Sequence, residues 1–296
     1  MAKVAIFGTE GMLGKSLVNI IGQEHDVVEF NRSGTKNRFS KKSQNFDAEN
    51  TTVAELHQLI QDCDFVFNSI AVVKQRIPKK VPAKVLSNVI RVNSNFPTLL
   101  EQSLSDQTKI IEIGTDCVFS GNRGSYIESD LKDPTDIYGW SKALGEIESE
   151  KIMRLRTSII GRQASQQSSL LDWFLSQEIN GKVAGFTNHF WNGMTTLQFS
   201  KIVLGIINKN LFSSGTYHLY SENKVTKGNL LALFRKYFER TDIEISMEAD
   251  SVFIDRSLGT SFPEMNSEIW QAAGYSKAPC IEEMLEEFAQ TTKMEG

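Results

Sequence analysis

Hydrophobic and polar positions follow two different periods through the first half of the chain. Short runs rich in β-branched and aromatic residues predict buried strands at Val4–Phe7, Val27–Phe30, Phe65–Ala71 and Lys109–Ile113. Between these runs, apolar residues recur at helical spacing and predict helices over Leu13–Gly22, Val53–Ile60 and Val85–Leu104. Because strands alternate with helices, we expect an α/β fold, a doubly wound parallel Rossmann sheet with its ligand crevice at the carboxyl ends of the strands.

The pattern changes after about residue 160. Residues 162–169 are polar and rich in glutamine, and the later segments predict a strand near Gly215–Tyr220 and helices near Leu197–Ile207, Gly228–Phe238 and Ile281–Ala289. We therefore expect a Rossmann domain over residues 1–160. Residues 161–296 should form mainly a smaller C-terminal substrate-binding lobe, with segments that return to the Rossmann domain.

Composition narrows the class of protein. Of the 296 residues, 40% are hydrophobic and 23% charged, and the net charge of −4 argues against nucleic-acid binding, which usually needs a basic surface. No apolar run approaches the roughly 20 residues that cross a bilayer. Three widely spaced cysteines and four histidines indicate no disulfide framework and no metal site. These features predict a soluble, cytoplasmic enzyme without a metal.

Glycines recur at every third position directly after the first predicted strand. Gly8 permits a tight turn, Gly11 lets the backbone approach a pyrophosphate, and Gly14 lets the next helix pack closely on the strand. A plain strand-to-helix turn also uses glycine, but the position at the start of the first helix favours dinucleotide binding. We expect cofactor contacts along this loop, from Gly8, Gly11, Met12, Leu13 and Gly14.

The end of the second predicted strand indicates which dinucleotide is bound. An NAD enzyme usually places an acidic residue there, whereas this chain has Asn31, Arg32 and Ser33. Because a guanidinium can bind a 2′-phosphate through two hydrogen bonds, Arg32 favours NADPH over NADH, with Ser33 as a further donor. Asp47 either accepts a hydrogen bond from the adenine amine or caps the next turn.

Tyr138 and Lys142 stand four residues apart, on one face of a predicted helix. An ammonium near a phenol stabilises the phenolate and lowers the pKa of the tyrosine from its usual value of about 10. Thr115 follows the strand Lys109–Ile113 and offers a hydroxyl at the edge where such a sheet presents its chemistry. Spacing alone is compatible with an ordinary amphipathic helix. A glycine loop, a strand-end hydroxyl and a Tyr–Lys helix in this order favour an active site.

The surrounding residues form a longer pattern, namely Gly114-Thr115-Asp116-Cys117-Val118-Phe119, then Tyr126, Glu128, Asp130 and Pro134, then Tyr138-Gly139-Trp140-Ser141-Lys142. This pattern, together with the glycine loop, resembles the extended short-chain dehydrogenase/reductases, most closely their dTDP-4-dehydrorhamnose reductase branch. Fainter resemblance at Arg156–Ser158 and Gly215–Leu219 extends it over most of the chain.

The resemblance implies an NADPH-dependent reductase of a nucleoside-diphosphate keto-sugar, active in deoxysugar or surface-polysaccharide biosynthesis. It implies a catalytic trio of Thr115, Tyr138 and Lys142, of which the last two also hold the cofactor, and nucleotide contacts at Asn68, Ser69 and Ala71. Asn93 is interpreted as a structural polar residue. We also expect substrate contacts from Asp116, Cys117, Phe119 and Trp191.

Two departures from the branch leave the sugar open. Cys117 stands where the family usually has tyrosine, and Ile159 stands where the branch usually has a substrate-facing tryptophan. Trp191 belongs to an aromatic, amide-rich segment, residues 186–196, which either contacts a sugar or base or packs into the core of its own lobe. The basic run of residues 74–80 either lies beside a pyrophosphate or, more simply, is solvated.

Two other functions are compatible with the same residues. One is an epimerase or dehydratase on the same fold, although Thr115-Asp116-Cys117 lacks the acidic pair that dehydratases tend to place after the threonine. The other is a non-catalytic NADP-binding regulatory subunit, which the intact trio disfavours. The expected partner is the nucleotide-sugar substrate, with no nucleic acid, no membrane and a possible homodimer.

Overall fold

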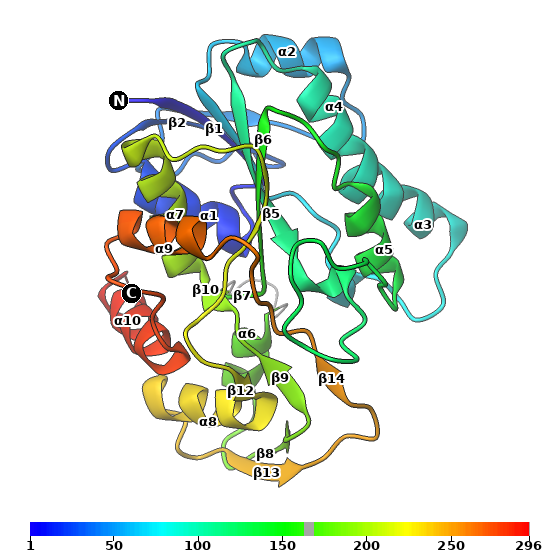
Figure 1. The fold of residues 1–296 in the computed structure, drawn as a ribbon, viewed down its shortest axis with the longest axis vertical. Helices are drawn as coiled ribbons and strands as arrows, with labels where there is room; N and C mark the ends of the chain where they lie inside the picture. Colours follow the sequence, from blue (N-terminus) through cyan, green and yellow to red (C-terminus); the bar gives the residue numbers. More distant parts are fainter. Residues whose placement is uncertain (163–168, 296) are drawn as a thin grey trace.

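The computed structural model describes residues 1–162 and 169–295. Its centre is a seven-stranded sheet in the order β11-β6-β5-β4-β1-β2-β3, in which all neighbours are parallel (Figure 1). The strands are β1 Lys3–Phe7, β2 Asp26–Asn31, β3 Lys42–Asn45, β4 Phe65–Asn68, β5 Lys109–Thr115, β6 Ile152–Thr157 and β11 Gly215–His218. The predicted doubly wound Rossmann sheet is confirmed.

The sheet has an apolar core on each face because its strands are covered on both sides. In β1, Val4 and Ile6 pack into one core cluster, whereas Ala5 and Phe7 pack into the other. The helices over the first cluster include α1 (Met12–Ile21), α7 (Thr196–Lys209) and α9 (Pro263–Ala272). Those over the opposite face are α2 (Val53–Ile60), α3 (Ala83–Ile90), α4 (Phe96–Gln102) and α5 (Ile137–Leu144).

The long helix predicted over Val85–Leu104 is interrupted. A π-helical segment at Arg91–Asn95 joins α3 to α4. Such segments mostly occur as single turns inserted in longer helices, often at functional sites. Here the turn directs Asn93, 1% exposed, toward the centre of the molecule.

The second half of the chain builds three small sheets beside the main one. They pair β8 (Lys182–Phe186) with β13 (Glu244–Glu248), β7 (Ile159–Ile160) with β10 (Met194–Thr195), and β9 (His189–Trp191) with both β12 (Val225–Thr226) and β14 (Ile254–Asp255). The remaining helices here are α6 (Leu170–Leu175), α8 (Lys227–Tyr237) and α10 (Ile281–Glu295). β11 and α7 belong to the main sheet and its helical layer. None of the described helices is long and apolar enough to cross a membrane.

Candidate active site

The carboxyl end of β5 turns sharply into a 3₁₀ helix at Asp116–Val118. The Thr115 hydroxyl accepts a hydrogen bond from the Cys117 N–H at 3.2 Å, which fixes the turn. Three polar side chains, those of Thr115, Asp116 and Cys117, are therefore placed together at the edge of the sheet.

Helix α5 packs directly against this turn. A Cβ on Gly139 would lie 2.2 Å from the Cys117 carbonyl oxygen, so only glycine permits the approach. The Asp136 carboxylate caps the helix by accepting the Gly139 N–H at 2.8 Å, and Lys74 pairs with the same carboxylate at 2.8 Å. This cap starts α5 so that its first turn carries Tyr138 to the end of β5. Lys74 thus has a structural partner, while Lys79 and Lys80 of the basic run are exposed.

Burial raises the pKa of Tyr138, and the nearby Cys117 adds to the rise, whereas interaction with the Thr115 side chain lowers it. The predicted lowering of this pKa by Lys142 is not found in this structure, because burial dominates. A tyrosine with a raised pKa keeps its proton at neutral pH, so the protonated phenol is the form present in this structure. Burial likewise raises the pKa of Asp116, and that of the Cys117 thiol to about 12, so the thiol is neutral.

Lys142 lies one helical turn after Tyr138 on α5, as the spacing predicts. Its side chain is buried, with 8% of the residue exposed. It makes no hydrogen bond and no ion pair with the residues that the structure describes. A buried ammonium needs hydrogen-bonding partners. Because Lys142 has none among the described residues, its three N–H donors remain available to a ligand.

Asn93 connects the loop after β4 to the catalytic helix. Its amide accepts a hydrogen bond from the Val72 N–H at 2.8 Å and donates to the Val72 carbonyl at 3.0 Å and to the Ser141 hydroxyl at 2.9 Å. Ser141 in turn donates to the Tyr138 carbonyl at 2.8 Å. These contacts support the structural interpretation of Asn93, which holds α5 against the loop expected to bind nucleotide.

The glycine loop after β1 forms a close backbone cradle. Gly8 has a φ of +85°, and a Cβ on Gly14 would lie 2.3 Å from the Gly8 carbonyl oxygen. The Ser69 hydroxyl donates to the Phe7 carbonyl at 2.6 Å and packs against the same loop. Gly11 begins α1 without a side-chain cap, so the first N–H groups of the helix face outward. This geometry suits a phosphate group.

Four other predicted cofactor residues are buried or half-buried in this structure. Leu13 is buried in the core, so only its backbone can reach a ligand. The Asn68 amide accepts a hydrogen bond from the Ile70 N–H at 3.0 Å, within its own turn. Met12 and Ala71 are half-buried at the loops after β1 and β4.

Asn31, predicted to bind cofactor, is instead committed to the fold. It is 3% exposed, and its NH₂ group donates to the hydroxyls of Thr9 and Ser43 and to the Thr35 carbonyl. Its carbonyl oxygen accepts the Gly34 N–H at 2.7 Å. The hydrogen-bonding capacity of this side chain is therefore used within the fold, and a cofactor contact at Asn31 stays a prediction. The Ser33 hydroxyl is likewise bonded to Thr35, at 2.7 Å.

A cavity of about 320 Å³ lies beside this turn. It is lined by Arg32, Asn45, Phe46, Asp47 and Glu49. The Arg32 guanidinium is mostly exposed and only loosely paired with Glu49, at 3.4 Å. The Asp47 carboxylate accepts hydrogen bonds from the Glu49 N–H and the Asn50 amide, so of the two predicted roles the structure shows the cap. Arg32 and Asp47 nevertheless face one space, at the edge of the sheet where β2 and β3 end.

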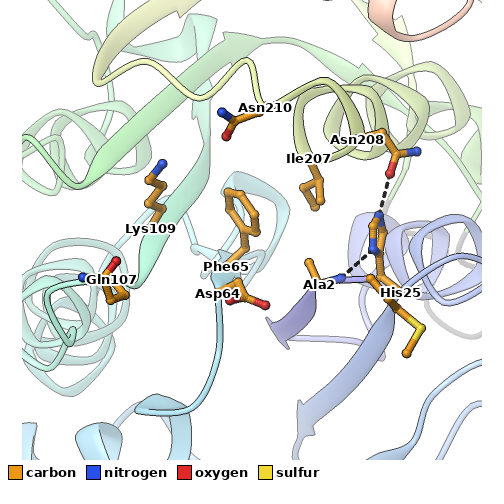
Figure 2. Close-up of a pocket in the computed structure, with 10 residues that line it drawn as sticks. Ala2, His25, Asp64, Phe65, Gln107, Lys109, Ile207, Asn208 and Asn210 are labelled. Atoms are coloured by element: carbon orange, nitrogen blue, oxygen red, sulfur yellow. Dashed lines mark hydrogen bonds between the residues drawn. The ribbon is translucent and has the colours of Figure 1, made fainter.

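A second cavity, of about 420 Å³, lies on the opposite side of the sheet's strands, at their amino ends (Figure 2). There His25 accepts a hydrogen bond from the Ala2 N–H at 3.0 Å, and its other ring nitrogen contacts the Asn208 amide oxygen at 2.9 Å. Phe65 and Lys109, which also line it, are the first residues of β4 and β5. Because catalytic groups gather at the carboxyl ends, this cavity is separate from the site.

Two of the predicted substrate residues prove to be packing residues. Phe119 is fully buried, stacks on Tyr126 with ring centroids 4.4 Å apart, and lies beneath the Arg156 guanidinium at 5.3 Å. Its ring is fully buried in this structure, and a contact of Phe119 with substrate stays a prediction. Trp191 is half-buried against the main core and donates its indole N–H to the Ser158 hydroxyl at 2.9 Å, as its core-packing alternative predicts.

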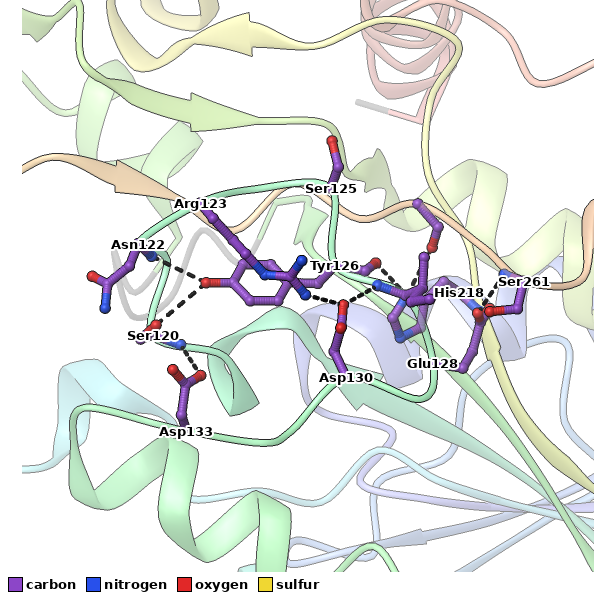
Figure 3. A network of polar contacts seen from close by, with 12 residues as sticks. Ser120, Asn122, Arg123, Ser125, Tyr126, Glu128, Asp130, Asp133, His218 and Ser261 are labelled. Carbon is purple, nitrogen blue, oxygen red and sulfur yellow. Dashed lines mark hydrogen bonds and ion pairs between the residues drawn. The ribbon is translucent and has the colours of Figure 1, made fainter.

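Sequence reasoning missed a buried polar network behind the site (Figure 3). One ring nitrogen of His218 contacts the carbonyls of Tyr126 and Gly259, each at 2.9 Å, and the other contacts the Arg156 guanidinium at 2.7 Å. Since carbonyls only accept, the first nitrogen carries the proton. Burial and Arg156 lower the pKa of His218. Its partners are up to 92 residues away, so no local pattern reveals the network.

Comparison with known proteins gives a consistent result. The chain matches the RmlD substrate binding domain family over residues 2–294. No curated protein matches it significantly by sequence.

Solved structures share the fold at low identity. A dTDP-4-dehydrorhamnose reductase from Bacillus anthracis, in complex with NADP, is 19% identical, with a TM-score of 0.77 over 98% of this chain and 99% of that one. A dTDP-4-dehydrorhamnose reductase from Clostridium acetobutylicum is 16% identical, with a TM-score of 0.75 over 99% of this chain and 100% of that one. A UDP-glucuronic acid 4-epimerase from Bacillus cereus, in complex with UDP-glucuronic acid and NAD, is 16% identical, with a TM-score of 0.75 over 98% of this chain and 99% of that one.

Proposed function

The chain belongs to the RmlD substrate binding domain family, and from that premise we propose that it is an NADPH-dependent reductase of a nucleoside-diphosphate keto-sugar. The solved structures of similar fold include dTDP-4-dehydrorhamnose reductases, one of them in complex with NADP. We propose the same class of reaction here, in the biosynthesis of a deoxysugar.

The observation that carries the proposal is the meeting of three side chains with a phosphate cradle. Thr115, Tyr138 and Lys142 come together at the end of β5, and the loops with Gly8 and Ser69 follow the neighbouring strands β1 and β4. Parallel strands present their carboxyl ends on one side of the sheet, so we expect the cradle and the three side chains to face the same ligand.

The residues present fit a nicotinamide dinucleotide. A Cβ at Gly14 would collide with the Gly8 carbonyl, so glycine keeps the loop tight against α1, and the uncapped start of α1 leaves backbone N–H groups for a pyrophosphate. Lys142 offers free donors suited to the hydroxyls of a ribose. When bound, the reduced cofactor supplies a hydride.

The side chains of this protein manage the proton and the substrate oxygen. The Thr115 hydroxyl would hydrogen-bond the keto oxygen, and Tyr138, whose raised pKa keeps it protonated, would donate its proton as that oxygen becomes an alkoxide. Lys142 would orient the cofactor by donating hydrogen bonds to the hydroxyls of its ribose. Arg32, which lines the cavity where β2 and β3 end, would contact the 2′-phosphate that distinguishes NADPH from NADH.

The direct test is oxidation of NADPH, followed by absorbance, with a panel of nucleoside-diphosphate 4-keto-6-deoxy sugars and with NADH in parallel. We expect turnover with at least one sugar and a lower KM for NADPH than for NADH. Binding of NADP(H) without turnover of any sugar would contradict a reductase and indicate a regulatory protein. A tightly bound NAD that copurifies and is regenerated in each cycle would indicate an epimerase.

A further inference from the structure

Charge is distributed unevenly along the chain. Residues 65–100 contain four lysines, two arginines and no aspartate or glutamate. This segment therefore carries a formal charge of +6, whereas the other residues together carry −10 and the whole chain −4. The segment covers β4, the loop after it, α3, the π-helical turn and α4. Its cations create a local field whose sign is opposite to that of the molecule as a whole.

Most of these cations are exposed and have no acidic partner. Lys74 pairs with Asp136 at 2.8 Å. The other five are exposed to solvent, and none of them forms an ion pair with residues 1–162 or 169–295. They are Arg76, Lys79, Lys80, Lys84 and Arg91. Because no carboxylate neutralises them, their charges act together on any charged group that approaches.

The first cation of the segment lies at the candidate active site. Lys74 is held to Asp136, the residue that caps α5 two positions before Tyr138. Its charge is one of those that oppose the rise in the pKa of the Cys117 thiol. Farther along, α3 packs beside α5 (Figure 1). We name residues 74–84 the basic loop, and it therefore runs beside the start of the catalytic helix.

Several cations near the site but outside the basic loop are neutralised by partners. Arg123 pairs with Asp130, Lys132 with Glu146, and Lys224 with Asp255. A close ion pair cancels most of its own field at a distance, whereas unpaired charges of one sign add. The field beyond the protein surface on this side therefore comes largely from unpaired cations such as those of the basic loop.

We propose that the basic loop steers the anionic substrate into the crevice, attracting it from solution while remaining solvated itself. This inference rests on the proposed function, because a nucleoside-diphosphate sugar carries a negative charge on each phosphate. A chain with a net charge of −4 would otherwise repel such a ligand. Steering of this kind raises association rates about 10–10³-fold and falls steeply with ionic strength.

The experiment measures association and dissociation rate constants of dTDP and UDP by stopped flow, with the protein saturated with NADP. The uncharged nucleosides thymidine and uridine are measured in parallel. Sodium chloride is varied from about 0.01 M to about 1 M, over which the Debye length falls from roughly 30 Å to roughly 3 Å. Thermal unfolding and NADP affinity at high salt check that each variant is folded.

The test variant neutralises four cations of the basic loop and keeps Lys74, because Lys74 supports the cap of α5. Its substitutions are Arg76→Gln, Lys79→Gln, Lys80→Gln and Lys84→Gln. A matched control neutralises four exposed cations on α7, α8 and α10, by Lys209→Gln, Arg235→Gln, Lys236→Gln and Lys293→Gln. Both variants have a formal net charge of −8 against −4 for wild type, so only the position of the lost charge differs.

At low salt, we expect the basic-loop variant to bind dTDP and UDP with association rate constants about tenfold lower than those of wild type. Its dissociation rate constants should change little, because the loop acts on the approaching ligand. The difference should shrink as salt rises and disappear near 1 M. The control variant should associate as wild type does, and binding of the nucleosides should be the same in all three proteins.

Equal association rates in wild type and the basic-loop variant at low salt, or no binding of either diphosphate by wild type, would overturn the proposal. A faster dissociation that persists at high salt would overturn it too, since it would show a contact in the bound complex. Sedimentation with phosphatidylserine vesicles adds one more outcome. Vesicle binding that depends on the basic loop, with unchanged association rates, would replace steering by a membrane-binding surface.

Failure of this proposal differs from failure of the proposed function, because association requires no turnover. Association that depends on the basic loop, without reduction of any keto-sugar, would remove the reductase and leave the steering. Reduction of a keto-sugar with the same salt dependence of kcat/KM in wild type and the basic-loop variant would do the reverse.

Discussion

The ends of β2 and β5 both carry polar residues expected to act on a ligand, but the two ends use those residues in opposite ways. At the end of β2, the buried Asn31 amide is bonded on both sides to its own turn and to the glycine loop. Beside the end of β5, Lys142 is equally buried and makes no bond to the described residues. A polar side chain whose capacity is spent inside the fold holds the fold, whereas one with capacity to spare can serve a ligand.

The largest expected effect tests the β5 end. Tyr138→Phe removes the hydroxyl that interacts with Thr115 and keeps the ring, so we expect kcat to fall about a hundredfold or more, since general acid catalysis is typically worth 10²–10⁴-fold. NADPH affinity should stay close to that of wild type. Steady-state kinetics and cofactor titration measure both quantities.

Tyr237→Phe is the matched control, because Tyr237 lies on α8 and, among the residues that the structure describes, its hydroxyl bonds to the surface side chains of Glu282 and Lys236. It should leave kcat unchanged. If Tyr138→Phe retained full turnover, the assignment of the catalytic trio would fail, and with it the contrast between the two strand ends.

The next prediction compares variants of Asn31 and Arg32, the neighbouring residues at the end of β2. Asn31→Ala leaves buried partners unsatisfied and should cost about 1–3 kcal/mol of unfolding free energy, whereas exposed Asn229→Ala should cost almost none. Arg32→Gln should leave stability unchanged and raise the Kd of NADPH about tenfold without changing that of NADH. Denaturant titration and cofactor binding separate the two. An Arg32→Gln variant with unaltered preference for NADPH would show that Arg32 is not the residue that recognises the 2′-phosphate.

Local patterns explain why some of the site could be predicted. The i, i+4 spacing of Tyr138 and Lys142 fixes one helix face, and strand ends in a parallel sheet always share an edge, so the trio and the glycine loop could be placed from sequence. The strands and most helices followed from their periodicity. The π-helical turn at Asn93 could not, because the partner of its side chain, Ser141, lies 48 residues away in the sequence.

Residues that depend on distant partners were the hardest to interpret. Asn31 looked available because its bond to Ser43 and its role in the glycine loop become visible only when β3 pairs with β2. Phe119 was expected to contact substrate, yet its ring packs on Tyr126 and lies beneath Arg156.

The smallest effect extends the comparison to a third strand end, that of β11. His218 resembles Asn31, because it is fully buried and all its ring nitrogens have partners within the protein. Burial and Arg156 lower its pKa below the usual value of about 6.5. The unfolded chain therefore binds a proton at a higher pH than the folded one does. The stability from neutral His218 is complete above about pH 6.5 and is lost as pH falls toward the folded pKa.

We therefore expect the difference in Tm between wild type and His218→Gln to shrink as pH falls from 7 to 5, since only wild type pays for protonation at this position. The other three histidines are common to both proteins and cancel in the comparison. A difference in Tm that stays constant over this range would show that His218 is not held neutral by its network. It would then have spare capacity, and the distinction drawn from β2 and β5 would not extend to β11.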